Sequence, residues 1–293
     1  MGDGVSHMSG KSFVANLEEI ILRFTKPAYM DSKDKIEDFI KEKATSQDKI
    51  PKGIFKSRDF NGLDVFTFGD ENAHYTILFV HGGAYINEIN YQHLLYCFKL
   101  SKSLDAHVIA PVYGLAPNHN AIECLDAIEK VYRGLIAQNR NIILMGDSAG
   151  GGFALSFCQH LKEIDLPQPE KIIVFSPWVD VSMDNPPYDN ENDPILGEIG
   201  LREIGRSWAG DLDMKDYRVS PLYGVNNGLP RTLVFVGGNE IFYRDIIKYV
   251  DNLKRDCVDV ELIVGGGLFH IYPLFPSPEA RNAFKEVKKE IIG

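Results

Sequence analysis

A serine flanked by glycines is the residue best placed to do chemistry in this chain of 293 residues. Ser148 is the centre of Gly-Asp-Ser-Ala-Gly, residues 146–150, directly after an apolar run and directly before a helical segment. Where a strand turns sharply into a helix, glycines two positions either side of a serine leave room for a strained backbone that exposes its hydroxyl. The free amides at the start of that helix would stabilise a developing negative oxygen. We therefore predict that Ser148 is a nucleophile.

Two consecutive glycines after an earlier apolar run could supply further amide donors. Gly82 and Gly83 follow His81, and with no side chain in the way their backbone amides can face a cavity. Together with the amide of Ala149, they are expected to form an oxyanion hole beside Ser148. His81 is expected to brace this loop and not to transfer protons.

A serine nucleophile of this kind needs a histidine base and an acid that orients it, each on a loop after a later strand. His270 is the predicted base, because the other histidine after the serine, His160, falls in the middle of a predicted helix. Two acids share the preceding loop region. Glu240 comes right after its strand and is favoured, and Asp245, at the start of the next helix, is the alternative.

Apolar runs of strand length alternate with helical segments over most of the chain. This alternation predicts an α/β fold with a mainly parallel sheet, because parallel neighbours need crossover connections. The predicted strands are residues 75–80, 107–112, 141–145, 171–175, 232–236 and 259–264. The predicted helices are residues 91–104, 120–138, 150–163, 243–256 and 279–291. Ahead of them, Asn61-Gly62 predicts a tight antiparallel hairpin at one edge of the sheet.

Two amino-terminal helices and a long insertion fall outside this alternation. Apolar residues recur at helical spacing over about 12–24 and 32–45. Residues 177–231 are rich in Pro, Asp, Asn and Gly and predict one clear helix, near 198–208. Over residues 180–216 the insertion carries ten acidic and three basic side chains. Long insertions between strands usually carry function, often as a lid, and a solvated acidic loop is the alternative.

The composition is that of an ordinary folded protein. Hydrophobic residues make up 44% of the chain, charged residues 25%, and a formal net charge of −10 repels nucleic acids and anionic lipid surfaces. The four cysteines lie far apart, and no metal-binding, dinucleotide-binding or phosphate-binding motif is present, so neither a metal nor a cofactor is expected. No apolar run approaches the length that crosses a membrane.

The amino terminus carries two further expectations. It has neither the basic start nor the apolar stretch of a secretion signal, so a cytoplasmic protein is expected. The Ser-His-Met run at residues 6–8 looks like a tag remnant, in which case Met8 is the natural start and the first seven residues are left out of the predicted fold.

The two glycine motifs together resemble a known family, the hormone-sensitive-lipase-like branch of the α/β-hydrolase esterases in its bacterial form. That family combines His-Gly-Gly with Gly-Asp-Ser-Ala-Gly-Gly, found here at residues 81–83 and 146–151. The pairing of both motifs at this separation is far more specific than either alone. The resemblance covers about residues 75–276 and departs from the family at Ala84, where many members have a third glycine.

The resemblance implies a fold, an activity and a site. The fold is a single α/β-hydrolase domain over residues 1–293, with helical cap elements at about 11–47 and 183–212. The activity is that of a serine carboxylesterase, which hydrolyses short-chain acyl esters of small molecules through an acyl-enzyme and can form a homodimer. The implied site comprises a catalytic triad and an oxyanion hole: Ser148, Glu240 and His270, with Gly82, Gly83 and Ala149.

Two other functions stay open. An amidase of the arylformamidase type has similar glycine and serine motifs. A non-catalytic binding protein on the same fold would hold a small ligand under the cap, as plant hormone receptors descended from this family do after losing the histidine. Because His270 is present, the binding protein is the less favoured of the two.

Overall fold

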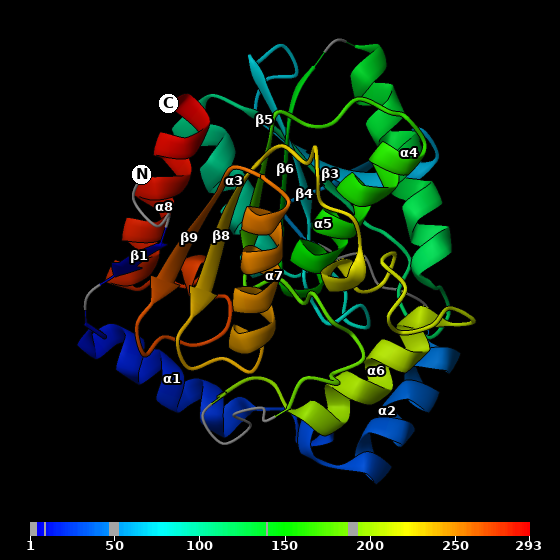
Figure 1. Cartoon of the computed structure of the whole chain (residues 1–293), viewed down its shortest axis with the longest axis vertical. Helices are drawn as coiled ribbons and strands as arrows, with labels where there is room; N and C mark the ends of the chain where they lie inside the picture. Colours follow the sequence, from blue (N-terminus) through cyan, green and yellow to red (C-terminus); the bar gives the residue numbers. More distant parts are fainter. Residues whose placement is uncertain (1–4, 9, 47–52, 139, 187–192) are drawn as a thin grey trace.

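One sheet of nine strands forms the centre of the part of the chain that the computed structural model describes, residues 5–8, 10–46, 53–138, 140–186 and 193–293 (Figure 1). The strands are β1 (Val5–Met8), β2 (Ser57–Phe60), β3 (Leu63–Phe68), β4 (Tyr75–Val80), β5 (His107–Pro111), β6 (Asn141–Asp147), β7 (Lys171–Phe175), β8 (Arg231–Gly237) and β9 (Val260–Gly265). Their order across the sheet is β1-β9-β8-β7-β6-β4-β5-β3-β2. Only the β2–β3 and β3–β5 neighbours are antiparallel, so the predicted α/β class with an antiparallel edge hairpin is confirmed.

The first strand was not predicted from the sequence. Residues 5–8 pair in parallel with β9, so that Val5 lies opposite Leu262. Residues 5–7, which the predicted fold left out, therefore belong to the sheet. A short edge strand needs only backbone hydrogen bonds to one neighbour. Its side chains therefore need not follow the apolar pattern from which strands are predicted.

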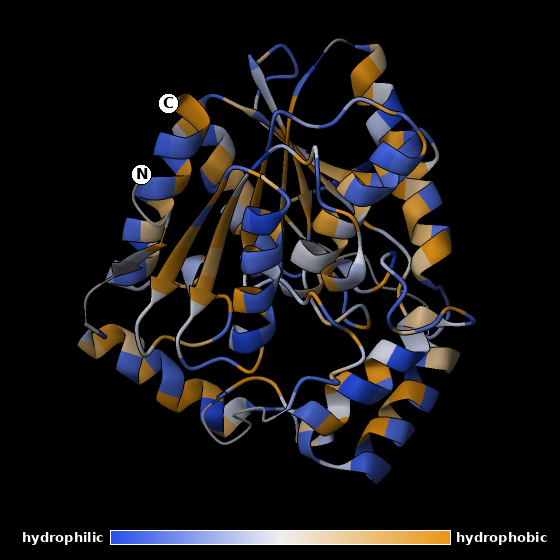
Figure 2. Ribbon diagram, in the orientation of Figure 1, coloured by the Kyte–Doolittle hydropathy of each residue, from blue (hydrophilic) through white to orange (hydrophobic). Residues whose placement is uncertain are grey.

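Helices cover both faces of the sheet (Figure 1). The helices on one face are α3 (Tyr91–Leu104) and α8 (Pro278–Ile292), and those on the other are α4 (Ala121–Ala137), α5 (Ser148–Glu163) and α7 (Tyr243–Arg255). Each face has its own buried hydrophobic cluster, and Figure 2 shows the strands as hydrophobic bands between helices with hydrophilic outer sides. Burial on both faces explains why the strands read as continuous apolar runs. The described residues also form three short 3₁₀ helices: η1 (Ala28–Asp31), η2 (Pro221–Tyr223) and η3 (Tyr272–Leu274).

Three more helices lie beyond the carboxyl ends of the strands, at the bottom of Figure 1: α1 (Phe13–Thr25), α2 (Lys33–Thr45) and α6 (Glu198–Ala209). Helices α2 and α6 pack against each other. Helix α6 also packs closely against η1, because a Cβ on Gly200 would lie 2.7 Å from the Cα of Met30. Helix α1 contacts α8 instead, and it leaves Phe13 81% and Phe24 87% exposed.

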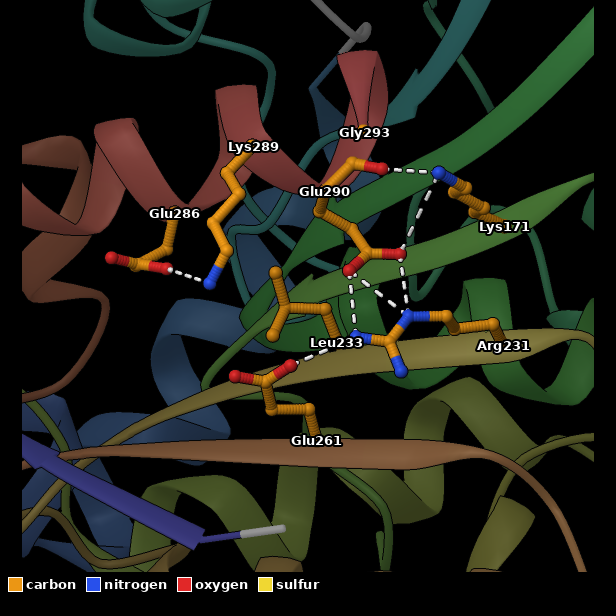
Figure 3. Close-up of a pocket in the computed structure, with 8 residues that line it drawn as sticks. All are labelled: Lys171, Arg231, Leu233, Glu261, Glu286, Lys289, Glu290 and Gly293. Carbon is orange, nitrogen blue, oxygen red and sulfur yellow. Dashed lines mark hydrogen bonds and ion pairs between the residues drawn. The ribbon is translucent and has the colours of Figure 1, made fainter.

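A charged cavity of about 300 Å³ lies at the opposite edge, near the amino-terminal ends of β7, β8 and β9 (Figure 3). Arg231, the first residue of β8, pairs with Glu290 of α8 and with Glu261 of β9, both at 2.8 Å. Lys171 also pairs with Glu290, at 3.8 Å. Arg231 and Lys171 thus tie the last helix to the sheet through Glu290.

Candidate active site

Ser148 lies at the sharp turn where β6 ends and α5 begins. Its backbone has φ 52°, in the left-handed region that L-residues rarely adopt. The two flanking glycines make this turn feasible, because a Cβ on Gly146 would lie 2.5 Å from the carbonyl oxygen of Gly150, and one on Gly150 would lie 2.2 Å from that of Val80. The side chain ends up 94% buried at the carboxyl edge of the sheet, where the helix amides begin.

His270 meets Ser148 at this edge. The Nε2 atom of His270 lies 2.8 Å from the Oγ atom of Ser148, and Nδ1 lies 3.3 Å from Oε1 of Glu240. The three side chains follow β6, β8 and β9, which are far apart in the sequence but end at the same edge of the sheet, with β7 between β6 and β8. The serine hydroxyl can therefore donate to the imidazole while the imidazole donates to the carboxylate.

The two acids considered from the sequence lie in different surroundings. The second carboxylate oxygen of Glu240 accepts hydrogen bonds from the Gly237 amide at 2.7 Å and from the Ser176 hydroxyl at 2.6 Å. Asp245, on the first turn of α7, accepts a hydrogen bond from the side-chain amide of Asn185 at 3.0 Å. Glu240 is therefore the acid beside His270.

Ser176 was not singled out as a site residue from the sequence. It follows β7 with φ 48°, and its hydroxyl donates to Glu240 and accepts the Ile271 amide at 2.9 Å. One hydroxyl thus holds the acid and the backbone next to the base. The sequence feature that could have indicated a role for Ser176 is its position directly after a buried strand, at the same edge of the sheet as Ser148.

The pKa of His270 is raised above its usual 6.5. Burial is the largest single influence and lowers it, but the hydrogen bond and charge of Glu240, with the charges of Asp193 and Asp147, together outweigh burial. The imidazole is consequently a stronger base than a free histidine.

Gly82 and Gly83, on the loop after β4, were both predicted to be oxyanion donors, and their amides have different surroundings. The Gly82 amide donates to the Oδ1 atom of Asp147 at 2.9 Å, so it is already engaged and does not serve as an oxyanion donor. No described residue accepts a hydrogen bond from the Gly83 or Ala84 amide. Gly83 has φ 122°, and a Cβ there would lie 2.5 Å from the Asn87 carbonyl oxygen, so this position requires glycine.

Asp147 is a second residue that sequence reasoning missed. It is fully buried between the serine turn and the glycine loop, and its Oδ2 atom lies 3.3 Å from Nε2 of His93 on α3. Because the Asn90 amide donates to His93 Nδ1, Nε2 carries the hydrogen and donates to Asp147. Burial would raise the pKa of Asp147, but His93 and the Gly82 amide lower it overall. An ionised Asp147 therefore fixes the glycine loop relative to the serine.

His81 has the bracing surroundings expected for it. Its Nδ1 atom lies 2.6 Å from the Gly82 carbonyl oxygen, its ring stacks on Tyr113, and burial lowers its pKa to about 3. A histidine that stays neutral at this depth is suited to packing the loop.

Among the described residues, no group of three or more His, Cys, Asp or Glu side chains could hold a metal ion. Likewise, no helix in the described ranges is both long and apolar enough to cross a membrane.

Comparisons with known proteins find similarity to α/β hydrolases and to esterases. A family model described as alpha/beta hydrolase fold matches residues 77–274. An esterase of Acinetobacter venetianus is 31% identical over 219 residues, 72% of each chain, and an acetyl-hydrolase of Streptomyces hygroscopicus is 25% identical over 217 residues, 72% of this chain and 73% of that one. A Staphylococcus aureus protein assigned as an esterase has a crystal structure with a TM-score of 0.84 and 27% identity, covering 95% of this chain and 98% of its own.

Proposed function

This chain belongs to the α/β-hydrolase family, and from that premise we propose that it is a serine carboxylesterase acting on short-chain acyl esters of small molecules. The observation that carries the proposal is the 2.8 Å contact of Ser148 Oγ with His270 Nε2, with Glu240 on the far side of the imidazole. This arrangement is the one that activates a serine hydroxyl for acyl transfer.

The proposed reaction has two halves. His270 takes the proton of Ser148 as its oxygen attacks the ester carbonyl carbon, and then gives that proton to the departing alcohol. Water, deprotonated by the same imidazole, cleaves the acyl-enzyme and releases the carboxylic acid. The negative oxygen of each tetrahedral intermediate accepts hydrogen bonds from the amides of Gly83 and Ala149, with Ala84 as the third donor.

Crowding around the serine supports a short acyl chain. Tyr85, next to the proposed amide donors, stacks on Trp208 of α6 with 4.1 Å between ring centroids. Phe242 packs edge-on against the ring of His270, at 5.2 Å, and stacks on Trp178. These side chains are buried and packed against one another, and we propose that they restrict the acyl chain to a short one.

We propose that α1, α2 and α6 act as the cap over this site, since all three lie beyond the strand ends that carry it. Of the two expected cap segments, residues 47 and 187–192 lie outside the described residues. The cytoplasmic location and the homodimer stay predictions.

The test of this function is a reactivity and substrate comparison. A fluorophosphonate probe should label Ser148, and p-nitrophenyl acetate and butyrate should be hydrolysed faster than the octanoate ester. An aryl formamide assayed in parallel measures the amidase alternative. Labelling with preference for the formamide would make the protein an amidase, and no labelling at Ser148 would support a binding protein.

Glu240 and Asp245 can be separated by two amide substitutions. Glu240→Gln should lower kcat about 10⁴-fold, because the carboxylate holds the imidazole in its active tautomer and stabilises its positive charge. Asp245→Asn, the matched control, should keep kcat within about threefold, since the carboxylate beside His270 is that of Glu240. Both kcat values are measured with p-nitrophenyl acetate. The reverse ranking would make Asp245 the acid.

Removing the carboxylate that fixes the glycine loop should also slow the reaction. Asp147→Ala is expected to lower kcat about 10²-fold, the effect of misplacing one oxyanion donor, with a smaller change in KM. Steady-state kinetics with p-nitrophenyl acetate measures both constants, and circular dichroism checks that the variant is folded. A folded variant with kcat within twofold of the parent would show that the loop keeps its position without Asp147.

A further inference from the structure

A buried carboxylate from the insertion reaches the loop that carries Glu240. Asp193 is 1% exposed and lies before α6, on the segment that leads into that helix. Its Oδ2 atom accepts the backbone amide of Ile241 at 2.9 Å, and Ile241 directly follows Glu240. Its Oδ1 atom accepts the amides of Ile195 and Leu196, both at 2.8 Å. One side chain therefore joins the insertion to the acid loop.

The hydrogen bonds to Ile195 and Leu196 stabilise a local turn. Many aspartates make such bonds in turns without any part in catalysis. The bond to Ile241 is different, because it crosses 48 residues of sequence and serves no turn. It fixes the backbone beside Glu240 from the side of the insertion, while Ser176 holds the carboxylate of Glu240 from the side of β7. The acid is thus held from two directions.

Asp193 also acts on His270 through its charge. Its three partners among the described residues are N–H donors, the surroundings of an ionised carboxylate, because a protonated one would need an acceptor for its hydrogen. Burial raises the pKa of Asp193 overall, and the charge of His270 and these three amides offset only part of that rise. The negative charges of Glu240, Asp193 and Asp147 all favour the protonated imidazole of His270, which contacts the Ser148 hydroxyl through Nε2.

We propose that Asp193 is a positioning residue for the acid and base pair, which holds the Glu240 loop in place through Ile241 and stabilises the protonated imidazole of His270 through its negative charge. This inference rests on the proposed function. It assigns the insertion a part in catalysis, because the residue that completes the alignment of the triad comes from outside the strands and loops that form it.

The experiment compares pH profiles of kcat/KM for p-nitrophenyl acetate in the parent protein, Asp193→Asn and Asp193→Glu. Hydrolysis needs neutral His270, so activity falls as the pH drops through the pKa of His270, which lies above 6.5 in the parent. Removing a negative charge nearby lowers that pKa. Asp193→Asn should therefore move the acid limb, the fall of kcat/KM at low pH, to lower pH by roughly 0.5 to 1 unit. The same variant should lower kcat about 10-fold, with less change in KM.

Asp193→Glu separates position from charge, and it also carries the test if the asparagine variant does not fold. The charge is kept, so the acid limb should stay within about 0.2 unit of the parent, but the longer side chain displaces the loop, so kcat should fall about 10-fold. The matched control is Asp180→Asn, a buried carboxylate of the same insertion whose partners are Ser182, Asn185 and Tyr223. Its acid limb should match that of the parent.

The outcomes distinguish this inference from the proposed function. If the parent neither reacts with a fluorophosphonate at Ser148 nor hydrolyses the ester, the proposed function fails and the role of Asp193 fails with it. If the parent is active and Asp193→Asn keeps both kcat and the acid limb of the parent, only the inference is overturned. An Asp193→Glu variant with the kcat of the parent, or an Asp180→Asn variant with the same shifted limb, would also overturn it.

Discussion

Replacing Ser148 with alanine should lower kcat for p-nitrophenyl acetate about 10⁶-fold and leave the fold intact. The hydroxyl is the atom group that forms the acyl-enzyme, so nothing in the variant can take its place. The fold should survive because alanine adopts the φ of 52° at this turn about as unfavourably as serine does. Steady-state kinetics gives the loss of activity, and thermal unfolding should show a midpoint close to that of the parent.

A second serine of the same helix is the control for this variant. Ser156 is buried on α5, and its hydroxyl donates to the carbonyl oxygen of Tyr217 at 2.9 Å. Ser156→Ala should lower stability by about 1 kcal/mol through the lost hydrogen bond and keep the activity of the parent. Full activity in Ser148→Ala, or labelling of that variant by a fluorophosphonate, would refute the assignment of the nucleophile.

The strands between β4 and β9 could be predicted closely from the sequence, because strands buried on both faces have to be apolar at every position. Residues 75–80 and 171–175 were predicted with the bounds that β4 and β7 have. Strand β1 could not be predicted, since pairing at the edge depends on backbone groups that every residue carries.

Helix α1 shows the limit of the helical pattern. The spacing of its apolar residues predicted a helix, and α1 forms over Phe13–Thr25. The pattern did not predict which side faces the protein: Phe13 and Phe24 are exposed, while Ala15 is buried. The spacing of apolar residues predicts that a segment is helical. Which side of the helix is buried depends on how other segments pack against it.

In the candidate site, the serine and the histidine could be predicted from the sequence, but the contacts that position them could not. Parallel strands end at one edge, so Ser148, at the end of one strand, and His270, on the loop after a later strand, were expected to meet. The contacts that position them are of another kind. Asp147 to Gly82 and Asp193 to Ile241 join segments 65 and 48 residues apart through single hydrogen bonds, and no spacing rule indicates them. The same contacts explain why the amide of Gly82, expected to face the substrate, faces Asp147 instead.

Replacing His270 with alanine should reduce kcat as much as removing the serine, about 10⁶-fold, because the hydroxyl has no other base to accept its proton. The two side chains act as one unit across their 2.8 Å contact, so the effects should not add. The double variant Ser148→Ala with His270→Ala should therefore have the same residual rate as either single variant, with p-nitrophenyl acetate as the substrate.

The remaining histidine downstream of the serine is the matched control for this prediction. His160 lies on α5 with its Nε2 atom 3.1 Å from Glu129, so His160→Ala should keep kcat within about twofold of the parent. The residual rate of His270→Ala should also lose the acid limb of the parent, since that limb reports protonation of the missing imidazole. A variant that retains a hundredth of the parent rate with the same acid limb would mean that another group is the base. A double variant far slower than either single one would mean that Ser148 and His270 act in separate steps.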